Sequence, residues 1–461
     1  MKERILNILS QLRMYALGKA CEIAIDYHKE DNQLMRFANS AISLNTNEHL
    51  IRIDITAMDG RKRANYGLIT NLDRLEEIQA GIDTAAEMVA HAQPLEYDPT
   101  MPTYQESFSD ESAFDLALVE MTNEEKLAYF NATAIDLESE EVKLSGIFAS
   151  GENIIAQINT RSEHTQFFRT SDAQVTVVLA HSTLKWEITA EQSAQKKGDL
   201  DPQALHRELA FLLDCYQHEA PLQLPLGPYD IVFGSAAIAD LLMFMNWIGF
   251  NGGSVKRGFS MLPEESVGKK VFSDKITLVD DPSRLETFPF QRDFMGMPRK
   301  LFPLVKAGIF QGFTWFQDDA DEYGAKPTGH TVMHKSLVLE GGQADAPSLE
   351  EFVRQPHQKD ILYIPFLHYS NIVNPSKGLV TGSSRFGALL LKKDGSVVVP
   401  YNVRITQSLL DVFGDKVEWL SKQTVAYNTS VSYGERNPTA LIVPRFMQVN
   451  DLEISHSNSS Y

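Results

Sequence analysis

The stretch Ile238-Ala-Asp-Leu-Leu-Met-Phe-Met-Asn-Trp-Ile-Gly249 decides how this chain folds, because it is apolar on almost every side of a helix. A helix with apolar residues all round is buried in a domain core or in a subunit interface. We therefore expect a buried helix from Ser235, with Met243 and its neighbours buried in the domain core or in a subunit interface. Two characteristic segments follow it, Val255-Lys-Arg-Gly-Phe-Ser-Met-Leu262 and Ile276-Thr-Leu-Val-Asp-Asp-Pro282.

Further segments follow this helix in a definite order and spacing. They are Pro289-Phe-Gln-Arg-Asp-Phe-Met-Gly-Met-Pro298, Leu304-Val-Lys-Ala-Gly-Ile-Phe-Gln-Gly312, Lys326-Pro-Thr-Gly-His330 with His334, Gly382-Ser-Ser-Arg-Phe-Gly387 and Ile405-Thr-Gln-Ser-Leu-Leu-Asp-Val-Phe413. Together they resemble the TldD/PmbA family, long labelled modulators of DNA gyrase and now regarded as a metallopeptidase system. The resemblance covers nearly the whole chain and is looser in the N-terminal part.

The resemblance also marks what this chain lacks. In catalytic members the central helix carries a His-Glu-x-x-x-His motif, which supplies two metal ligands and a general base. An ungapped match back from Lys256-Arg257-Gly258 places these functions at Met243, Phe244 and Ile248, and none of these side chains can bind zinc or move a proton. The third ligand of catalytic members is a Cys, absent from the corresponding Tyr427-Asn-Thr-Ser-Val-Ser-Tyr-Gly434. We therefore expect no metal and no other cofactor in this chain.

Two functions from different classes follow from the resemblance. In the first, which we favour, the chain is a metal-free subunit of the PmbA type, also called the TldE type. It would form a heterodimer with a TldD-like subunit that holds the zinc, and would shape a channel for extended peptides without hydrolysing them. In the second, the chain is a stand-alone hydrolase with a private active site, or a homodimeric peptide-binding protein.

Composition and charge narrow the class of partner. The chain has 461 residues, 43% apolar and 22% charged, which is typical of a soluble globular protein with two or three domains. Its net charge of -19 disfavours nucleic acid or an anionic membrane as the main partner, because phosphate binding needs clustered Lys and Arg. The gyrase label therefore does not imply DNA binding. The longest apolar run, 241–250, is too short to span a membrane.

Two features predict a cytoplasmic protein. The N-terminus has no apolar segment or cleavage site typical of an export signal. Cys21 and Cys215 are too few to form a disulfide framework, which favours a reducing compartment.

The pattern of apolar residues predicts an α+β fold in two domains. Residues 1–225 should form an α/β domain with an antiparallel sheet and flanking helices, and residues 226–461 a mostly antiparallel β domain that contains the buried helix. The prolines at 221, 225 and 228 mark the boundary. In the first domain we expect helices over 3–20, 72–91, 124–137 and 202–218, and four or five short strands between 142 and 189, among them 142–149 and 154–159. Thr122 with Glu125 predicts a capping box, and Asp201-Pro202 predicts a helix start.

Two histidines and an arginine are candidates for a site in the inherited cleft. His330 and His334 have the i,i+4 spacing that would let them share a metal on a helix. The glycine and proline before them and the extended run after them favour a strand, on which four residues span about 13 Å, too far for shared chelation. We therefore expect both to hydrogen-bond within the fold. His330, His334 and Arg257 are the residues that we expect to line the cleft.

Other reactive pairs have simpler explanations. Cys215 and His218 lie three residues apart on an expected helix, but the apolar neighbours of Cys215 favour a buried, inert thiol. Ser384 lies in Gly382-Ser-Ser-Arg-Phe-Gly387, which lacks the spacing of a nucleophile elbow. Asp280 and Asp281 point to opposite faces if extended, so we expect them to fix the turn before Pro282. Gly252 and Gly253 lack the Lys of a phosphate-binding loop and are expected to end the central helix.

Overall fold

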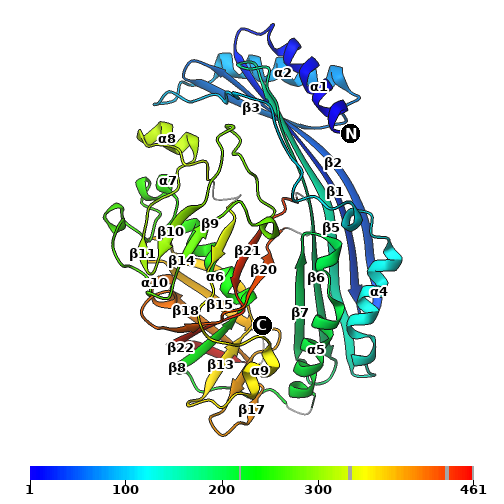
Figure 1. Cartoon of the computed structure of the whole chain (residues 1–461), viewed down its shortest axis with the longest axis vertical. Coiled ribbons are helices and arrows are strands. Elements are labelled where there is room, and N and C mark those ends of the chain that lie inside the picture. Colours follow the sequence, from blue (N-terminus) through cyan, green and yellow to red (C-terminus); the bar gives the residue numbers. More distant parts are fainter. Residues whose placement is uncertain (218–219, 331–334, 431–435, 459–461) are drawn as a thin grey trace.

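A long antiparallel hairpin follows the first helix in the computed structural model, which describes residues 1–217, 220–330, 335–430 and 436–458. Its strands β1 (Glu22–Ala38) and β2 (Ala41–Asp59) pair along their whole length. Asn39 and Ser40, the two residues of the turn, both have positive φ, which is the backbone shape that matches the twist of a tight hairpin. The strands run from one end of the molecule to the other (Figure 1).

The hairpin is the centre of a single N-terminal sheet with the strand order β3-β2-β1-β5-β6-β4, in which β7 also pairs with β6. The added strands are β3 (Lys62–Ile69), β4 (Phe108–Asp110), β5 (Val142–Asn159), β6 (Gln166–His181) and β7 (Glu187–Ala194). The prediction of separate strands over 142–149 and 154–159 is wrong, because β5 is continuous. Gly151 lies in the middle of β5 where a Cβ atom would come 2.5 Å from the backbone oxygen of Asp31, so this glycine permits a close approach of two strands and does not end one.

Helices cover one face of this sheet at both ends. At one end lie α1 (Lys2–Ala16) and α2 (Leu75–His91), and nearer the other end lie α3 (Leu116–Val119), α4 (Asn123–Ala134) and α5 (Pro202–Tyr216) (Figure 1). The side chain of Thr122 accepts from the backbone of Glu125 in a complete capping box, and the side chain of Asp201 accepts from the backbone of Ala204. Both predicted helix starts are therefore confirmed.

The C-terminal lobe places α6 (Ser235–Gly249) between two sheets. Among the described residues, one sheet has six strands: β9 (Leu278–Asp280), β10 (Phe302–Lys306), β11 (Ile309–Phe310), β12 (Leu337–Leu339), β20 (Thr424–Asn428) and β21 (Ala440–Pro444). The other has nine: β8 (Gly227–Gly234), β13 (Ile361–Ile364), β14 (Phe366–Asn374), β15 (Leu379–Arg385), β16 (Leu389–Leu391), β17 (Val397–Val398), β18 (Asn402–Ser408), β19 (Val417–Leu420) and β22 (Phe446–Asn458). Short helices lie at their margins: α7 (Gly252–Lys256), α8 (Gln317–Tyr323), α9 (Leu349–Arg354) and α10 (Leu409–Val412).

This arrangement confirms the predicted α+β class, with a mostly antiparallel C-terminal part around one central helix. Among the described strands, two pairs in the C-terminal lobe are parallel, β8 with β13 and β12 with β21, and one pair in the N-terminal sheet, β4 with β6. The boundary proposed at residue 225 falls between α5 and β8. In the part of the chain that the structure describes, no helix is both long and apolar enough to cross a membrane.

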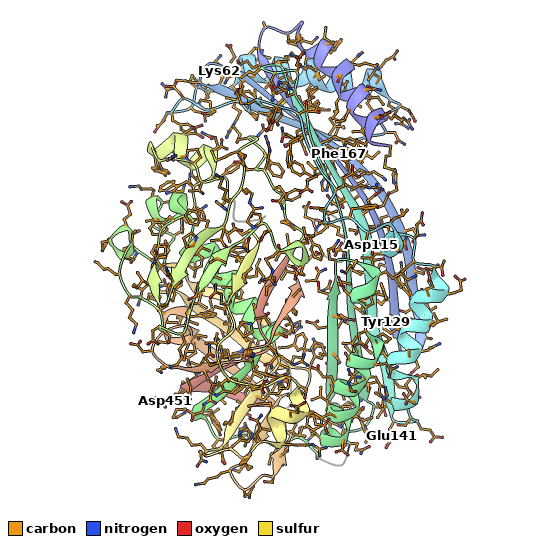
Figure 2. The ribbon with its side chains drawn as sticks, viewed as in Figure 1. Lys62, Asp115, Tyr129, Glu141, Phe167 and Asp451 are labelled. Carbon is orange, nitrogen blue, oxygen red and sulfur yellow. The ribbon has the colours of Figure 1, made fainter. Side chains whose placement is uncertain are left out.

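Polar contacts join the two lobes along the uncovered face of the N-terminal sheet. Arg63 pairs with Asp318 at 2.6 Å at one end, and Arg385 pairs with Glu187 at 2.8 Å towards the other. Between them, the rings of Phe168 and Phe290 meet edge to face at 5.4 Å. Figure 2 shows side chains of both lobes filling the space between β6 and β7 on one side and β20 and β21 on the other.

Candidate functional site

The central helix α6 leaves one side outside the core. Asp240, Met243, Phe244 and Trp247 are only partly buried or exposed, and Trp247 is 44% exposed. Their spacing places them on one face of the helix, which we call the outer stripe. Met243 and Phe244 are only partly buried within the chain, so the expectation that the domain core buries them is wrong on this side, and their burial in a subunit interface stays a prediction. The two sheets cover the other sides of the helix and leave the stripe only partly covered.

The three positions matched to the metal motif do not share one environment. Met243 and Phe244 belong to the outer stripe, whereas Ile248 is 5% exposed and packs into the core. The rings of Phe244 and Trp247 meet edge to face at 6.1 Å. This surface can bind apolar side chains, but its thioether and hydrocarbon groups offer zinc no suitable ligand.

Asp240 is the ionisable group of the outer stripe. Burial raises the pKa of its carboxyl, and the Ser370 hydroxyl of β14 opposes that rise. The strand β14 is the edge of the nine-stranded sheet and lies beside α6, where Pro365 O accepts from Ala237 N at 3.0 Å. Edge strands present unpaired backbone groups. The stripe therefore adjoins a strand edge, on which Tyr369 and Val373 are exposed.

His330 does not line an open cleft, so that prediction is wrong. Its side chain is 3% exposed, and its Nε2 lies 3.1 Å from the backbone oxygen of Lys300, to which it donates. Burial lowers the pKa of the imidazole, so the ring is neutral at pH 7. Its other close polar neighbour is the carboxylate of Asp280 at 3.8 Å. His334, its predicted companion, lies outside the described residues.

Asp280 and Asp281 have different roles. Asp281 accepts from the backbone and hydroxyl of Ser283 at 3.0 and 2.7 Å, which fixes the turn as expected. Asp280 does not serve the turn: it is fully buried and accepts from Arg299 at 2.8 Å and from the backbone of Ser336 at 2.7 Å. A buried carboxylate must be paired, and Arg299 provides the pairing charge.

A buried amine connects this polar cluster to α6. Lys335 donates to the side-chain oxygen of Asn246 at 2.8 Å, and burial lowers the pKa of its ammonium group to about 8. Asn246 lies next to the outer stripe on the helix surface but is itself buried. The cluster of Asp280, Arg299, His330 and Lys335 therefore supports the helix from inside the lobe and does not form an open catalytic centre.

Arg257 is held by acidic side chains of the neighbouring helix. It pairs with Asp319 at 2.8 Å and also with Glu322, both on α8, so its charge is neutralised within the lobe. Gly252 and Gly253 begin α7 and do not end α6, contrary to the prediction. A Cβ atom at Gly253 would lie 2.3 Å from the Asp319 carboxylate, so these glycines let α7 pack closely on α8.

The comparisons with known proteins agree with this architecture. A family model, described as the PmbA/TldA metallopeptidase C-terminal domain, matches residues 226–456, which is half of the chain. The chain belongs to the TldD/PmbA family. A search of curated proteins finds no match.

Solved structures show the same fold over the whole chain. TldE from Thermococcus kodakarensis has a TM-score of 0.80 and 17% identity, with 97% of this chain and 100% of that chain covered. A candidate modulator of DNA gyrase from Bacteroides thetaiotaomicron has a TM-score of 0.77 and 14% identity, with 97% and 98% covered. A similar protein from Thermotoga maritima has a TM-score of 0.73 and 14% identity, with 97% and 99% covered. Because the sequence identities are this low, the similarity to these structures shows a shared fold and nothing further.

The segment matched to the third ligand of catalytic TldD/PmbA members is fastened at both ends to one carboxylate. Asp172, on β6, accepts from Asn428 at 2.8 Å and forms a two-pronged ion pair with Arg436. The backbone of Arg436 also donates to Glu30 at 2.6 Å. Residues 431–435 between these ends lie outside the described residues. These contacts, which the sequence patterns did not reveal, tie the segment to the N-terminal sheet.

The Cys215 thiol has the inert environment that was expected, and Ser384 lies within β15. Burial, with a smaller contribution from Asp214, raises the pKa of the Cys215 thiol to about 11, so the thiolate form is rare at pH 7. The Ser384 oxygen is buried and accepts from the backbone of Val403 at 2.9 Å. His218 lies outside the described residues. In the described part of this family member, no group of three His, Cys, Asp or Glu side chains is placed to hold a metal.

Proposed function

We propose that this chain is the metal-free, TldE-type subunit of a two-subunit peptidase. Its partner would be a TldD-type subunit that binds zinc and carries out hydrolysis, and the pair would act on extended peptides. The observation that carries the proposal is the occupation of the motif positions on α6 by Met243, Phe244 and Ile248. A chain that keeps the family scaffold without these ligands is best explained by a role in assembly or in substrate binding.

The outer stripe gives this subunit a surface on which an extended peptide could bind. Partly exposed thioether and aromatic groups beside the edge of β14 offer an apolar surface and unpaired backbone groups together. An extended peptide is recognised through those two features, because backbone groups provide affinity and side-chain pockets provide specificity. We therefore assign the stripe to one wall of the peptide channel. The two free cysteines, Cys21 and Cys215, support work in a reducing cytoplasm.

The alternative is a protein that acts without a partner, either as a hydrolase with a private active site or as a homodimeric peptide binder. The hydrolase is less well supported, because the Cys215 thiol is kept protonated and the Ser384 oxygen is engaged with the backbone. A homodimer that binds peptides without cleaving them is consistent with the same stripe. An assay with and without a partner separates these functions.

The test is a cleavage assay on unfolded peptides with this chain alone, with a TldD-type subunit from the same genome, and with both together. We expect the two chains to co-purify and to cleave only when both are present. A chelator, or removal of the partner's catalytic Glu, should abolish cleavage. The matched control pair is Trp247→Ala on the outer stripe and Trp419→Ala in the other half of the lobe, of which only the first should weaken cleavage. Turnover by this chain alone that survives the chelator would refute the proposal.

A further inference from the structure

A cavity of about 550 Å³ lies in the C-terminal lobe, on the face of the nine-stranded sheet that points away from α6. Alternate residues of β13 show which face this is. Leu362 packs into the core around α6, whereas Ile361 packs into the cluster that contains Phe352 of α9 and also lines the cavity. The helix α9 lies beside β13 (Figure 1). A volume of about 300–1,000 Å³ is typical of sites for small ligands, so this cavity is large enough to hold one.

Aromatic rings form part of the cavity wall. The rings of Phe352 and Trp419 lie 5.8 Å apart, and the ring of His357 lies 5.4 Å from that of Phe352. Phe352 is buried, whereas Trp419 keeps part of its surface exposed. All three residues line the cavity. A cation placed over an aromatic face is attracted to it, most strongly over Trp. The wall therefore suits a ligand that is positively charged and able to stack.

His357 adds a hydrogen-bond acceptor that lacks a partner. Its ring donates to the backbone oxygen of Val353, and its Nε2 is buried without a hydrogen-bond partner among the residues that the structure describes. The donating nitrogen is therefore Nδ1. Burial lowers the pKa of the imidazole, so at pH 7 the ring is neutral and Nε2 carries a lone pair. A buried acceptor without a partner is costly, and a donor on a ligand in the cavity would supply the missing bond.

A chain of hydrogen bonds along β19 and β22 ends on a carboxylate. The Trp419 indole donates to Gln448 at 2.7 Å, and Gln448 donates to Asn450 at 2.8 Å. Asn450 in turn donates to Glu418 at 3.0 Å. All four side chains line the cavity. Each donor points towards the next residue, so the group at the end of the chain is an acceptor with a negative charge.

Two carboxylates leave the cavity with an uncompensated negative charge. Glu418 accepts from a neutral amide, and Asp345 likewise accepts from the amide of Gln423 at 2.7 Å. In the described ranges no ion pair joins either carboxylate to a cation. The third carboxylate of the cavity, Asp230, is different, because it pairs with Lys359 at 3.1 Å. The groups that remain free to bind a ligand are therefore acceptors, and their field favours a cation.

We propose that this cavity binds a guanidinium group, carried either by a small molecule or by an arginine side chain. A guanidinium is planar, stacks on aromatic rings and donates up to five N–H groups. It therefore matches the rings of Phe352 and Trp419 together with the acceptors of Glu418, Asp345 and His357. An ammonium group is more strongly hydrated and cannot stack. A metal ion is a poorer fit, because no group of three His, Cys, Asp or Glu side chains in the described residues is placed to hold one.

The inference stands independently of the proposed function, because the cavity and α6 lie on opposite faces of the nine-stranded sheet. Titration calorimetry on the full-length protein tests it with N-acetyl-L-arginine amide. The matched probe is N-acetyl-L-citrulline amide, which has the same shape but an uncharged urea group. The arginine probe should bind at least about tenfold more tightly, because charge-assisted hydrogen bonds are the stronger ones. Equal affinities, or no binding of the arginine probe, would overturn the proposal.

Free L-arginine distinguishes the two sources of the guanidinium. Its own carboxylate would lie close to Glu418 and Asp345. Tighter binding of the capped probe than of free arginine supports an arginine side chain within a peptide. Tighter binding of free arginine supports a small molecule.

Charge-neutral variants show whether binding occurs in this cavity. Glu418→Gln keeps an oxygen for the Asn450 amide but removes the charge, and should weaken binding of the arginine probe by about tenfold. Asp345→Asn, at an exposed position, should also weaken it and does not depend on Glu418→Gln folding. His357→Phe keeps an aromatic ring and removes the acceptor, so it should weaken binding as well. Glu265→Gln is the control for net charge, because Glu265 is exposed on the same lobe outside the cavity, and should leave the affinity unchanged. Equal affinities in Glu418→Gln, Asp345→Asn and Glu265→Gln would overturn the site.

Discussion

Rebuilding the metal motif on α6 would test how the helix is oriented. Ile248 is 5% exposed, so Ile248→His removes about 1.5–3 kcal/mol of apolar burial. It also buries an imidazole without a designed partner, at a further cost of about 1–3 kcal/mol. We expect a total loss of about 3–5 kcal/mol. This corresponds to a fall of roughly 10 °C in the melting temperature of the C-terminal lobe, using the scaling for domains of that size.

Phe244→Glu should cost much less, because Phe244 lies on the outer stripe and its new carboxylate can reach water. The loss is the partial burial of one ring plus repulsion from Asp240, four residues earlier, of about 0.2–0.5 kcal/mol. We expect a total loss of about 1 kcal/mol in stability, or 2–4 °C in melting temperature. The matched control Phe244→Gln carries no charge, so it should avoid the part of the loss that comes from repulsion. The assay is thermal and urea unfolding of each single variant. A loss in Phe244→Glu as large as that in Ile248→His would refute the orientation assigned to α6.

Three further predictions concern other parts of the chain. Purified protein, dialysed and analysed for metal, should carry no stoichiometric zinc, because a site needs about four N, S or O ligands; one zinc per chain retained against a mild chelator would contradict this. Asp172→Leu and Arg436→Met should each cost about 3–5 kcal/mol in urea unfolding, while the double variant should cost less than their sum, because it leaves no unpaired buried charge. Lys335 has a pKa of about 8 in the folded state, below its usual 10.4. Burial of its charged form therefore lowers the free energy of unfolding below pH 8, and this loss is relieved between pH 8 and 10 as the folded protein releases the proton. Lys335→Met should therefore flatten the rise in stability over that window by up to about 3 kcal/mol, and an identical slope in both proteins would contradict the assignment.

The sequence predicted those parts of the fold that depend on local pattern. Thr122 with Glu125 and Asp201 with Pro202 mark helix starts through hydrogen bonds within one turn, and the apolar run from Ser235 marks α6. The sequence did not predict the continuity of β5 through Gly151 or the start of α7 at Gly252. In both cases a neighbour distant in sequence requires the glycine, namely the backbone of Asp31 at Gly151 and the ring of Trp315 at Gly252. Contacts of this kind leave no local periodic signal.

The same limit applies to the candidate site. The match of the motif to Met243, Phe244 and Ile248 came from the sequence, but the division between outer and inner positions did not. That division depends on which sides of α6 the two sheets cover. The buried polar groups were missed altogether, because Lys335 and Glu191 look like ordinary surface residues until the fold encloses them.

Two carboxyl groups in the junction between the lobes, Asp172 and Glu191, have different surroundings. Asp172 forms a buried ion pair with Arg436, so the loss of either partner leaves an unpaired buried charge. Burial raises the pKa of Glu191 to about 8, so its carboxyl is protonated at pH 7. The junction therefore combines a buried ion pair with a buried carboxyl group that burial keeps neutral at pH 7. Asn428 and Arg436 both bind Asp172, so substitution of this one carboxylate would remove contacts of two residues of the C-terminal lobe with the N-terminal sheet.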